Sequence, residues 1–165
     1  MNILINDGLH PAGIELLKNA GHKVDTNNIP QEELLGKLNE YDAILVRSAT
    51  TVRKDLMDAA PNLKLIGRGG VGLDNIDLVS AKEKNIAVFN TPAASSRSVA
   101  ELAMAHLFGI VRSLPAVNKA MSIDGVSDFK ALKKSASKGI ELQGKTLGLI
   151  GFGRIGRETA SIAIG

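Results

Sequence analysis

One stretch near the C-terminal end decides the fold: Lys145-Thr146-Leu147-Gly148-Leu149-Ile150-Gly151-Phe152-Gly153-Arg154-Ile155-Gly156-Arg157. A short apolar run ends there in the spacing Gly151-x-Gly153-x-x-Gly156, and a helix-forming segment follows. A strand that breaks into this spacing and opens a helix is typical of the phosphate-binding turn of a dinucleotide site. The alternative is a tight junction between strand and helix that binds no ligand.

Each glycine has its own expected role in such a turn. Gly151 makes the tight bend, Gly153 lets the backbone approach a pyrophosphate, and Gly156 lets the helix pack closely on the strand. The N-terminus of the helix then offers unpaired N–H groups and the positive end of its dipole to phosphate.

Composition narrows the class of protein. The chain has 165 residues, of which 44% are hydrophobic and only 3% aromatic, so we expect an aliphatic core. The formal net charge of +3 is too small to indicate nucleic-acid binding. The absence of cysteine excludes disulfides and a thiolate nucleophile or metal ligand. The N-terminal residues do not resemble a secretory signal, and no apolar stretch approaches the length of a membrane span, so we expect a cytoplasmic protein.

Strand-like and helix-like segments alternate through the first part of the chain. We expect strands over 2–6, 23–25, 43–46, 64–67 and 86–89, and helices over 11–20, 31–39, 53–60 and 76–84. This alternation predicts an α/β domain over residues 1–95, with a doubly wound parallel sheet.

The second part, residues 96–165, has a different pattern. Ser98 and Glu101 have the spacing of a capping box, and the helix they open, 98–112, is apolar nearly all round. Such a helix is expected to be buried between layers, with Pro115 ending it and one helix and a loop over 116–142. A strand over 147–150 and the glycine turn follow. The partner strand and the acidic residue that separates NAD from NADP would lie past Gly165, so we expect an incomplete domain.

Four more motifs accompany the glycine turn, in the order 45–50 (LVRSAT), 67–77 (GRGGVGLDNID), 89–92 (FNTP) and 98–102 (SVAEL). Together they resemble the D-2-hydroxyacid dehydrogenase family, and more narrowly its members that oxidise 3-phospho-D-glycerate to 3-phosphohydroxypyruvate in the first step of phosphorylated L-serine biosynthesis. The resemblance implies a flavodoxin-like substrate lobe followed by the start of a Rossmann cofactor domain. It also implies NAD as cofactor and a homo-oligomer, dimer or tetramer, with neither a nucleic-acid nor a membrane partner.

The resemblance also assigns residues. At the substrate it places Arg47, Ser48, Arg68, Gly69 and Gly70. At the cofactor it places Val71, where the family often has threonine, together with Gly151, Gly153, Arg154, Ile155 and Gly156, with the backbone N–H groups of Arg154 and Ile155 on the pyrophosphate. Because the carboxyl ends of parallel strands meet at one edge of a sheet, we expect Arg47 and Arg68 to converge on one crevice, where guanidinium groups suit phosphate and carboxylate.

No catalytic residue is expected within this chain. The family's catalytic arginine, glutamate and histidine correspond to positions beyond Gly165, so Arg112, Glu101 and His106 do not take those roles, and the chain alone is expected to be inactive. His106 is expected to be a hydrogen-bonded residue of the core or of an interface. Asp74 and Asp77 are expected to cap a helix or lie in its first turn. No metal site is expected.

Three alternatives stay open. The first is a related dehydrogenase that acts on glyoxylate, hydroxypyruvate or lactate, which would need less positive charge than Arg47 and its neighbours supply. The second is an NAD-sensing relative that acts as a transcriptional corepressor without turnover. The third is a receiver-like α/β module, which needs an acidic cluster that Asp7 alone does not provide.

Overall fold

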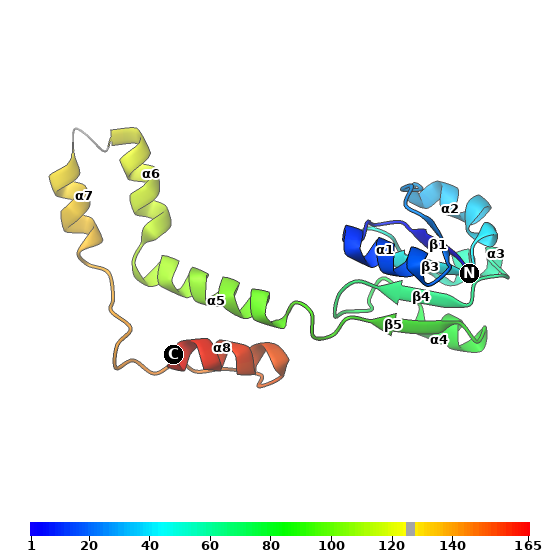
Figure 1. Cartoon of the computed structure of the whole chain (residues 1–165). Coiled ribbons are helices and arrows are strands. Elements are labelled where there is room, and N and C mark those ends of the chain that lie inside the picture. Colours follow the sequence, from blue (N-terminus) through cyan, green and yellow to red (C-terminus); the bar gives the residue numbers. More distant parts are fainter. Residues whose placement is uncertain (125–127) are drawn as a thin grey trace. The chain divides into compact units, whose positions relative to one another are not determined.

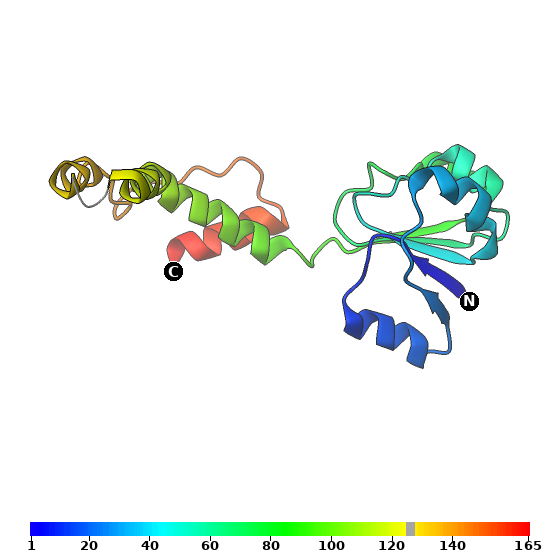
Figure 2. The same cartoon turned by 90° about the horizontal axis from the view of Figure 1, so that it is seen from above.

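The computed structural model describes residues 1–124 and 128–165. The chain divides into two compact units, Met1–Ala94 and Ser95–Gly165. Their elements are drawn in Figures 1 and 2.

The first unit is built on a parallel sheet with the strand order β2-β1-β3-β4-β5. The strands are β1 (Asn2–Ile5), β2 (Lys23–Asp25), β3 (Ala43–Val46), β4 (Leu65–Arg68) and β5 (Ala87–Asn90). The chain moves outward from β1 to β2 and then returns to the other side of β1, so the order reverses between β1 and β3. This order confirms the predicted doubly wound, flavodoxin-like sheet.

Helices cover the two faces of this sheet unequally. Figure 2 shows α1 (Pro11–Asn19) on one face and α2 (Gln31–Lys37), α3 (Lys54–Ala59) and α4 (Leu78–Glu83) on the other, with the short 3-10 helix Leu38–Glu40 following α2. Because side chains alternate along a strand, Leu4 points into the larger core beneath α2, α3 and α4. Its neighbours Ile3 and Ile5 point into the smaller core beneath α1.

The start of α4 is set by Asp77, one of the two carboxylates expected near a helix N-terminus. Its side chain accepts hydrogen bonds from the backbone N–H of Val79 at 3.1 Å and of Ser80 at 3.0 Å, and from the Ser80 hydroxyl at 2.8 Å. These bonds lower the pKa of Asp77 and satisfy two N–H groups that the helix itself leaves free. The prediction for Asp77 is therefore confirmed.

The second unit consists of helices α5 (Ser96–Val111), α6 (Leu114–Asp124), α7 (Phe129–Ala136) and α8 (Arg154–Ile164). The expected capping box is wrong: α5 begins at Ser96, so Ser98 lies inside the helix. Glu101 instead accepts a hydrogen bond from Arg97 Nε at 2.9 Å, one turn earlier on the helix. Two oppositely charged residues four apart on a helix attract each other, which gives Glu101 a partner that the capping box did not anticipate.

The break after α5 also differs from the prediction. Pro115 does not end α5 but lies in the first turn of α6, where its fixed φ suits a helix start. The chain turns two residues earlier, at Ser113, which adopts a left-handed φ of 53°. Residues 116–142, predicted as one helix and a loop, hold most of α6 and all of α7, and residues 125–127 within this range lie outside the described residues.

The strand expected over 147–150 is absent from the described residues, which are irregular there and have no hydrogen-bonded neighbour strand. The helix α5, which we expect to be buried between layers, is only partly covered in this chain. Within this unit α5 packs on α8 along one stripe that includes Ala100 and Met104, while His106 is exposed and Ile110 is 74% exposed. Packing along one stripe leaves the other sides of a helix exposed.

Among the described residues no single helix is long and apolar enough to cross a membrane; α5 and the first part of α6 reach that length only together, with a 65° bend between them.

Candidate functional site

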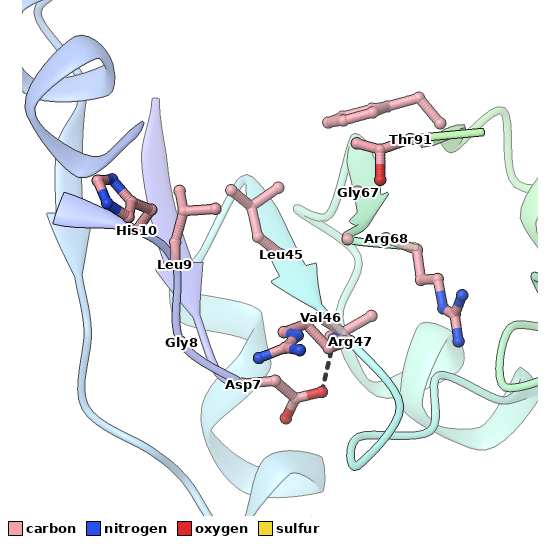
Figure 3. Close-up of a pocket in the computed structure, with 12 residues that line it drawn as sticks. Asp7, Gly8, Leu9, His10, Leu45, Val46, Arg47, Gly67, Arg68 and Thr91 are labelled. Carbon is pink, nitrogen blue, oxygen red and sulfur yellow. Dashed lines mark hydrogen bonds between the residues drawn. The ribbon is translucent and has the colours of Figure 1, made fainter. Parts of the chain in front are cut away.

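A pocket of about 490 Å³ opens at the carboxyl ends of β1, β3, β4 and β5 in the first unit (Figure 3). It is lined by Asp7, Gly8, Leu9, His10, Leu45, Val46, Arg47, Gly67, Arg68, Gly69, Phe89 and Thr91. The pocket therefore includes the point between β1 and β3 where the strand order reverses, which is where open α/β sheets bind their ligands.

Arg47 and Ser48 directly follow β3, and both side chains are exposed at this edge of the sheet. The aliphatic stem of Arg47 lies beside Gly69, since a Cβ added to that glycine would come within 3.4 Å of Arg47 Cγ. The Arg47 guanidinium thus remains available to a ligand in the pocket.

Arg68 lines the same pocket, but its guanidinium does not converge with that of Arg47. Figure 3 shows the Arg68 side chain pointing away from Arg47. The cause is a shift of one residue: Arg68 is the last residue of β4 rather than the first residue after it. A strand residue points opposite to its neighbour, so Arg68 takes the face opposite to Gly67.

The Arg68 guanidinium packs against the glycine loop that follows it, residues 69–72. A Cβ added at Gly70 would collide with Arg68 Nη1, and one at Gly72 would lie 3.8 Å from the same atom. Arg68 Nε is buried and has no hydrogen-bond partner in the described residues. A buried donor without a partner is unfavourable, so this guanidinium has unused capacity to bind an acceptor.

The backbone N–H groups of Gly69 and Gly70 already have partners. Gly69 donates to Val46 O at 2.8 Å, and Gly70 donates to Thr91 Oγ1 at 2.9 Å. Thr91 donates its own N–H back to Gly70 O at 3.0 Å. These bonds tie the glycine loop to the ends of its neighbouring strands and leave the pocket's charge to the arginine side chains.

Two residues that the sequence reasoning did not assign to the site, Asp7 and Asn75, hold the backbone of the turn 47–50. Asp7 Oδ2 accepts the N–H of Arg47 at 2.6 Å, drawn as a dashed line in Figure 3. Asn75 Nδ2 donates to Arg47 O at 2.8 Å. The sequence does contain one indication of this role. Asp7 follows the first strand, and that end of β1 borders the pocket.

Asp7 is ionised at neutral pH. Burial alone would raise the pKa of Asp7, but hydrogen bonds from the Thr50 hydroxyl and from backbone N–H groups of residues 47–50 outweigh it and lower the pKa. The pocket lining therefore combines two guanidinium groups, Arg47 and Arg68, with one carboxylate, an excess of one positive charge when His10 is neutral. This balance favours a small anionic ligand.

The other side of the pocket is apolar. Leu45, Gly67 and Phe89 lie opposite one another in the β3–β4–β5 register. A Cβ added to Gly67 would lie 2.5 Å from both Leu45 Cδ2 and Phe89 Cζ, so the glycine is what lets these two side chains close over β4. A ligand in the pocket would meet charge at one end and hydrocarbon at the other.

The glycine turn of the second unit has the features expected of a phosphate-binding turn. Gly151 adopts a φ of +95°, and Gly153 is the N-cap of α8, with nothing within 4 Å of an added Cβ. A Cβ added to Gly156 would collide with the carbonyl oxygen of Gly151. Gly156 is therefore needed for packing, whereas Gly153 leaves open space beside the backbone.

The remaining predicted cofactor residues lie in both units. Arg154 and Ile155 form the first turn of α8, where backbone N–H groups lack partners within the helix. Val71 lies in the glycine loop of the first unit, and its carbonyl accepts a hydrogen bond from Asn90 Nδ2 at 2.6 Å. Among residues 1–124 and 128–165, no group of three or more histidine or carboxylate side chains is placed to hold a metal ion.

The chain is similar over nearly its whole length to one family of enzymes. The model of the family described as D-isomer specific 2-hydroxyacid dehydrogenase, catalytic domain, matches residues 3–160. The chain is 44% identical to the D-3-phosphoglycerate dehydrogenase of Methanocaldococcus jannaschii over 163 residues, which covers 99% of the chain and 30% of that protein. It is 45% identical to the hydroxypyruvate reductase of Thermotoga maritima over 161 residues, which covers 97% of the chain and 51% of that protein.

A solved structure agrees. NAD⁺-bound 3-phosphoglycerate dehydrogenase from Entamoeba histolytica matches with a TM-score of 0.75 and 27% identity, over 99% of the chain and 50% of the solved chain. The chain thus spans between 30% and 51% of the length of these relatives.

Proposed function

The chain belongs to the D-isomer specific 2-hydroxyacid dehydrogenase family, and on that premise we propose that the whole protein oxidises 3-phospho-D-glycerate to 3-phosphohydroxypyruvate with NAD. In this reaction a hydride leaves C2 of the hydroxy acid for the nicotinamide, and the product enters L-serine biosynthesis. The first unit would hold the substrate and the second would hold the cofactor's pyrophosphate.

The observation that carries this proposal is the exposed Arg47 guanidinium at the edge of an anion-favouring pocket. A phosphorylated hydroxy acid has two anionic groups, and guanidinium groups bind phosphate and carboxylate through paired hydrogen bonds. Ser48, next in the turn and also exposed, would add a hydroxyl. Arg68 and Gly69 would line the pocket beside Arg47, and Gly70, which does not line it, would complete the loop after β4 that binds the substrate.

NAD would supply the hydride acceptor when bound. The residues present fit its pyrophosphate, because the open space beside Gly153 and the free N–H groups at the start of α8 offer room and donors together. We propose that Gly151, Gly153, Arg154, Ile155 and Gly156 form this turn and that Val71 is a further cofactor-binding residue. We assign no catalytic acid, base or metal ligand within the chain.

The second candidate is reduction of hydroxypyruvate, an unphosphorylated substrate. The 45% identity to the Thermotoga maritima hydroxypyruvate reductase favours it as strongly as the phosphoglycerate dehydrogenase match favours the first. Such a substrate has no phosphate to bind, so its turnover should depend less on the two arginines.

The proposed setting is a cytoplasmic homo-oligomer, either a dimer or a tetramer. The oligomer is supported by the apolar surface of α5, where Leu102, Phe108 and Ile110 are 57%, 49% and 74% exposed. Apolar side chains grouped on one helix favour association with another protein surface.

The test measures kcat/KM of the whole protein for 3-phospho-D-glycerate oxidation and for hydroxypyruvate reduction, in the wild type, Arg47→Ala and Arg68→Ala. A charge-assisted contact contributes about 1.5–3 kcal/mol, so loss of Arg47 should lower kcat/KM for the phosphorylated substrate by about 10- to 100-fold. Lys64→Ala is the matched control, since it removes one positive charge at the opposite end of β4, where Lys64 pairs with Asp42.

The outcomes separate the candidates. Preference of the wild type for hydroxypyruvate, with little effect of either arginine, would favour the second candidate. Near-normal kcat/KM for 3-phospho-D-glycerate in both arginine variants would remove the physical support for a phosphorylated substrate.

A further inference from the structure

The turn 47–50, which follows β3, has its backbone held at both ends by the same two side chains. Asp7 Oδ2 accepts the N–H of Arg47 at 2.6 Å and the N–H of Thr50 at 3.0 Å. Asn75 Nδ2 donates to the carbonyl of Arg47 at 2.8 Å and to the carbonyl of Thr50 at 2.7 Å. One acceptor and one donor thus fix both backbone groups of the first and last residues of the turn.

The Thr50 hydroxyl also holds the Asp7 carboxylate in place. It accepts a hydrogen bond from Asn6 Nδ2 at 2.8 Å and donates to Asp7 Oδ1 at 2.5 Å. A hydroxyl can do both at once. Asn6 is 3%, Thr50 4% and Asn75 5% exposed, so these three side chains are shielded from water, whereas Asp7 is only partly buried because it also lines the pocket. Hydrogen bonds among the buried groups are stronger than the same bonds in water.

The side chains of the turn are arranged in the opposite way. Arg47, Ser48 and Ala49 are exposed, and the hydrogen bonds from Asp7 and Asn75 do not involve the Arg47 or Ser48 side chain. Asp7, Thr50 and Asn75 therefore hold the main chain, which leaves the Arg47 side chain to the pocket and the Ser48 side chain exposed beside it. Holding a backbone in its binding conformation lowers the entropy that a ligand must remove, which improves affinity without a direct contact.

We propose that Asp7, Thr50 and Asn75 are positioning residues that hold the Arg47–Ser48 turn in the conformation that binds the anionic group of the substrate. The inference rests on the proposed function of this pocket. It also gives Asp7 a role other than that of a receiver-type phosphate acceptor, because both of its carboxylate oxygens are already engaged with the turn.

The first test compares Thr50→Val, which removes the hydroxyl at nearly constant shape, with Thr50→Ser, which keeps it. Thr51→Val is the matched control, because Thr51 hydrogen bonds to Gln31 through its backbone only. The dissociation constant of the 165-residue chain for 3-phospho-D-glycerate is measured by calorimetry well below each variant's unfolding midpoint. Loss of one hydrogen bond predicts a rise of about 3- to 10-fold for Thr50→Val, with Thr50→Ser and Thr51→Val within about twofold of the wild type.

A merely structural role for Thr50 gives a different result. It would lower the unfolding midpoint of Thr50→Val and leave the dissociation constant unchanged, and that outcome would overturn the proposal.

The second test needs no ligand. Heteronuclear NOE values for the amides of residues 47–50 should fall in Thr50→Val and stay at wild-type values in Thr51→Val. If the wild-type chain binds neither 3-phospho-D-glycerate nor inorganic phosphate, the proposed function of the pocket fails, but this measurement still decides the positioning role. A turn that stays as ordered in Thr50→Val as in the wild type would contradict it.

A second pair of variants applies if Thr50→Val does not fold. Asp7→Asn replaces the carboxylate that holds the turn. Asp25→Asn replaces a carboxylate of the same unit that hydrogen bonds to the Tyr41 hydroxyl instead. The positioning role predicts disorder of residues 47–50 in the first variant and not in the second, and equal order in both would count against it.

Discussion

Both units contain short apolar runs, but the side chains of these runs are buried in the first unit and exposed in the second. In the first unit the apolar runs form strands whose central side chains, such as Leu4, Ile44 and Ile66, are fully buried. In the second unit a similar run at 147–150 stays irregular and exposed, with Ile150 fully accessible. Among the described residues of that unit only Ala100 and Met104 are buried apolar side chains. The difference teaches that an apolar run becomes a buried strand only where neighbouring strands and covering helices surround it.

The largest effect that tests this comparison is on stability. Ile44→Ala removes a fully buried side chain from β3 and should lower the free energy of unfolding of the first unit by about 2–5 kcal/mol. The same change at Ile110, which is 74% exposed, should change stability by less than about 0.5 kcal/mol.

Urea unfolding followed by tyrosine fluorescence reports on the first unit, since Tyr41 is the only tyrosine and the chain has no tryptophan. Circular dichroism at 222 nm follows the helices of both units. Equal effects of the two substitutions would show that Ile110 is buried in solution and that the contrast between the units is wrong.

The glycine turn offers a second contrast, between two glycines three residues apart. Gly156→Ala should disrupt the turn, because its Cβ would collide with the Gly151 carbonyl, and overpacking against a backbone atom costs about 1–3 kcal/mol. Gly153→Ala should leave the turn folded, since nothing lies within 4 Å of its added Cβ. It should nevertheless weaken NADH binding, because the methyl group would occupy the space needed by the pyrophosphate.

Thermal unfolding and NADH titration of both variants check this prediction. Unchanged NADH affinity in Gly153→Ala would show that the turn is a structural junction without a phosphate site.

A third and smaller effect concerns helix starts. Asp77→Ala should lower the unfolding midpoint of the first unit by a few degrees, because it removes three hydrogen bonds at the N-terminus of α4. Ser98→Ala should have almost no effect, because Ser98 lies inside α5 and caps nothing. Differential scanning calorimetry of the two variants distinguishes these cases, and a clear loss in Ser98→Ala would restore the capping box that the sequence indicated.

The smallest expected effect is on pH dependence. The carboxyl groups with a lowered pKa among the described residues, Asp7, Asp25, Asp42, Asp58 and Asp77, all lie in the first unit. A lowered pKa means that the ionised form stabilises the fold, so this stability is present above the unfolded-state pKa of about 3.9 and is lost as pH falls through the lower folded-state value. Acid should therefore unfold the first unit before the helices of the second.

Tyr41 fluorescence and circular dichroism recorded between about pH 6 and pH 2 check this order of unfolding. Asp7→Asn should make the fluorescence transition less dependent on pH, because it removes one of these carboxyl groups. Simultaneous loss of both signals in the wild type would contradict the prediction.

The sheet of the first unit could be predicted well because each strand and helix is marked by residues within it or next to it. Periodicity, glycine and proline mark each strand and helix to within a few residues, and right-handed connections leave few ways to assemble them. An error of one residue mattered at Arg68, since placing it after β4 instead of at its end reversed the direction of its side chain.

Contacts between distant residues could not be predicted in the same way. Asp7 and Asn75 both hydrogen bond to the backbone of Arg47, although they lie 40 and 28 residues from it along the sequence. No local pattern indicates such a pairing, whereas the position of Asp7 at the end of β1 indicates only that it borders the pocket. The strand expected over 147–150 failed for a related reason, because a strand requires a partner that its own residues do not specify.

The central claim is that the first unit binds the anionic substrate at the turn 47–50 and the second binds the cofactor's pyrophosphate at the turn 151–156. The most direct measurement is a pair of ¹⁵N-edited NMR titrations of the 165-residue chain, one with 3-phospho-D-glycerate and one with NADH. The first ligand should shift the amides of residues 7–10, 47–50 and 67–71, and the second should shift those of residues 151–157. Shifts from 3-phospho-D-glycerate that spare residues 47–50, or shifts from NADH that spare residues 151–157, would contradict it.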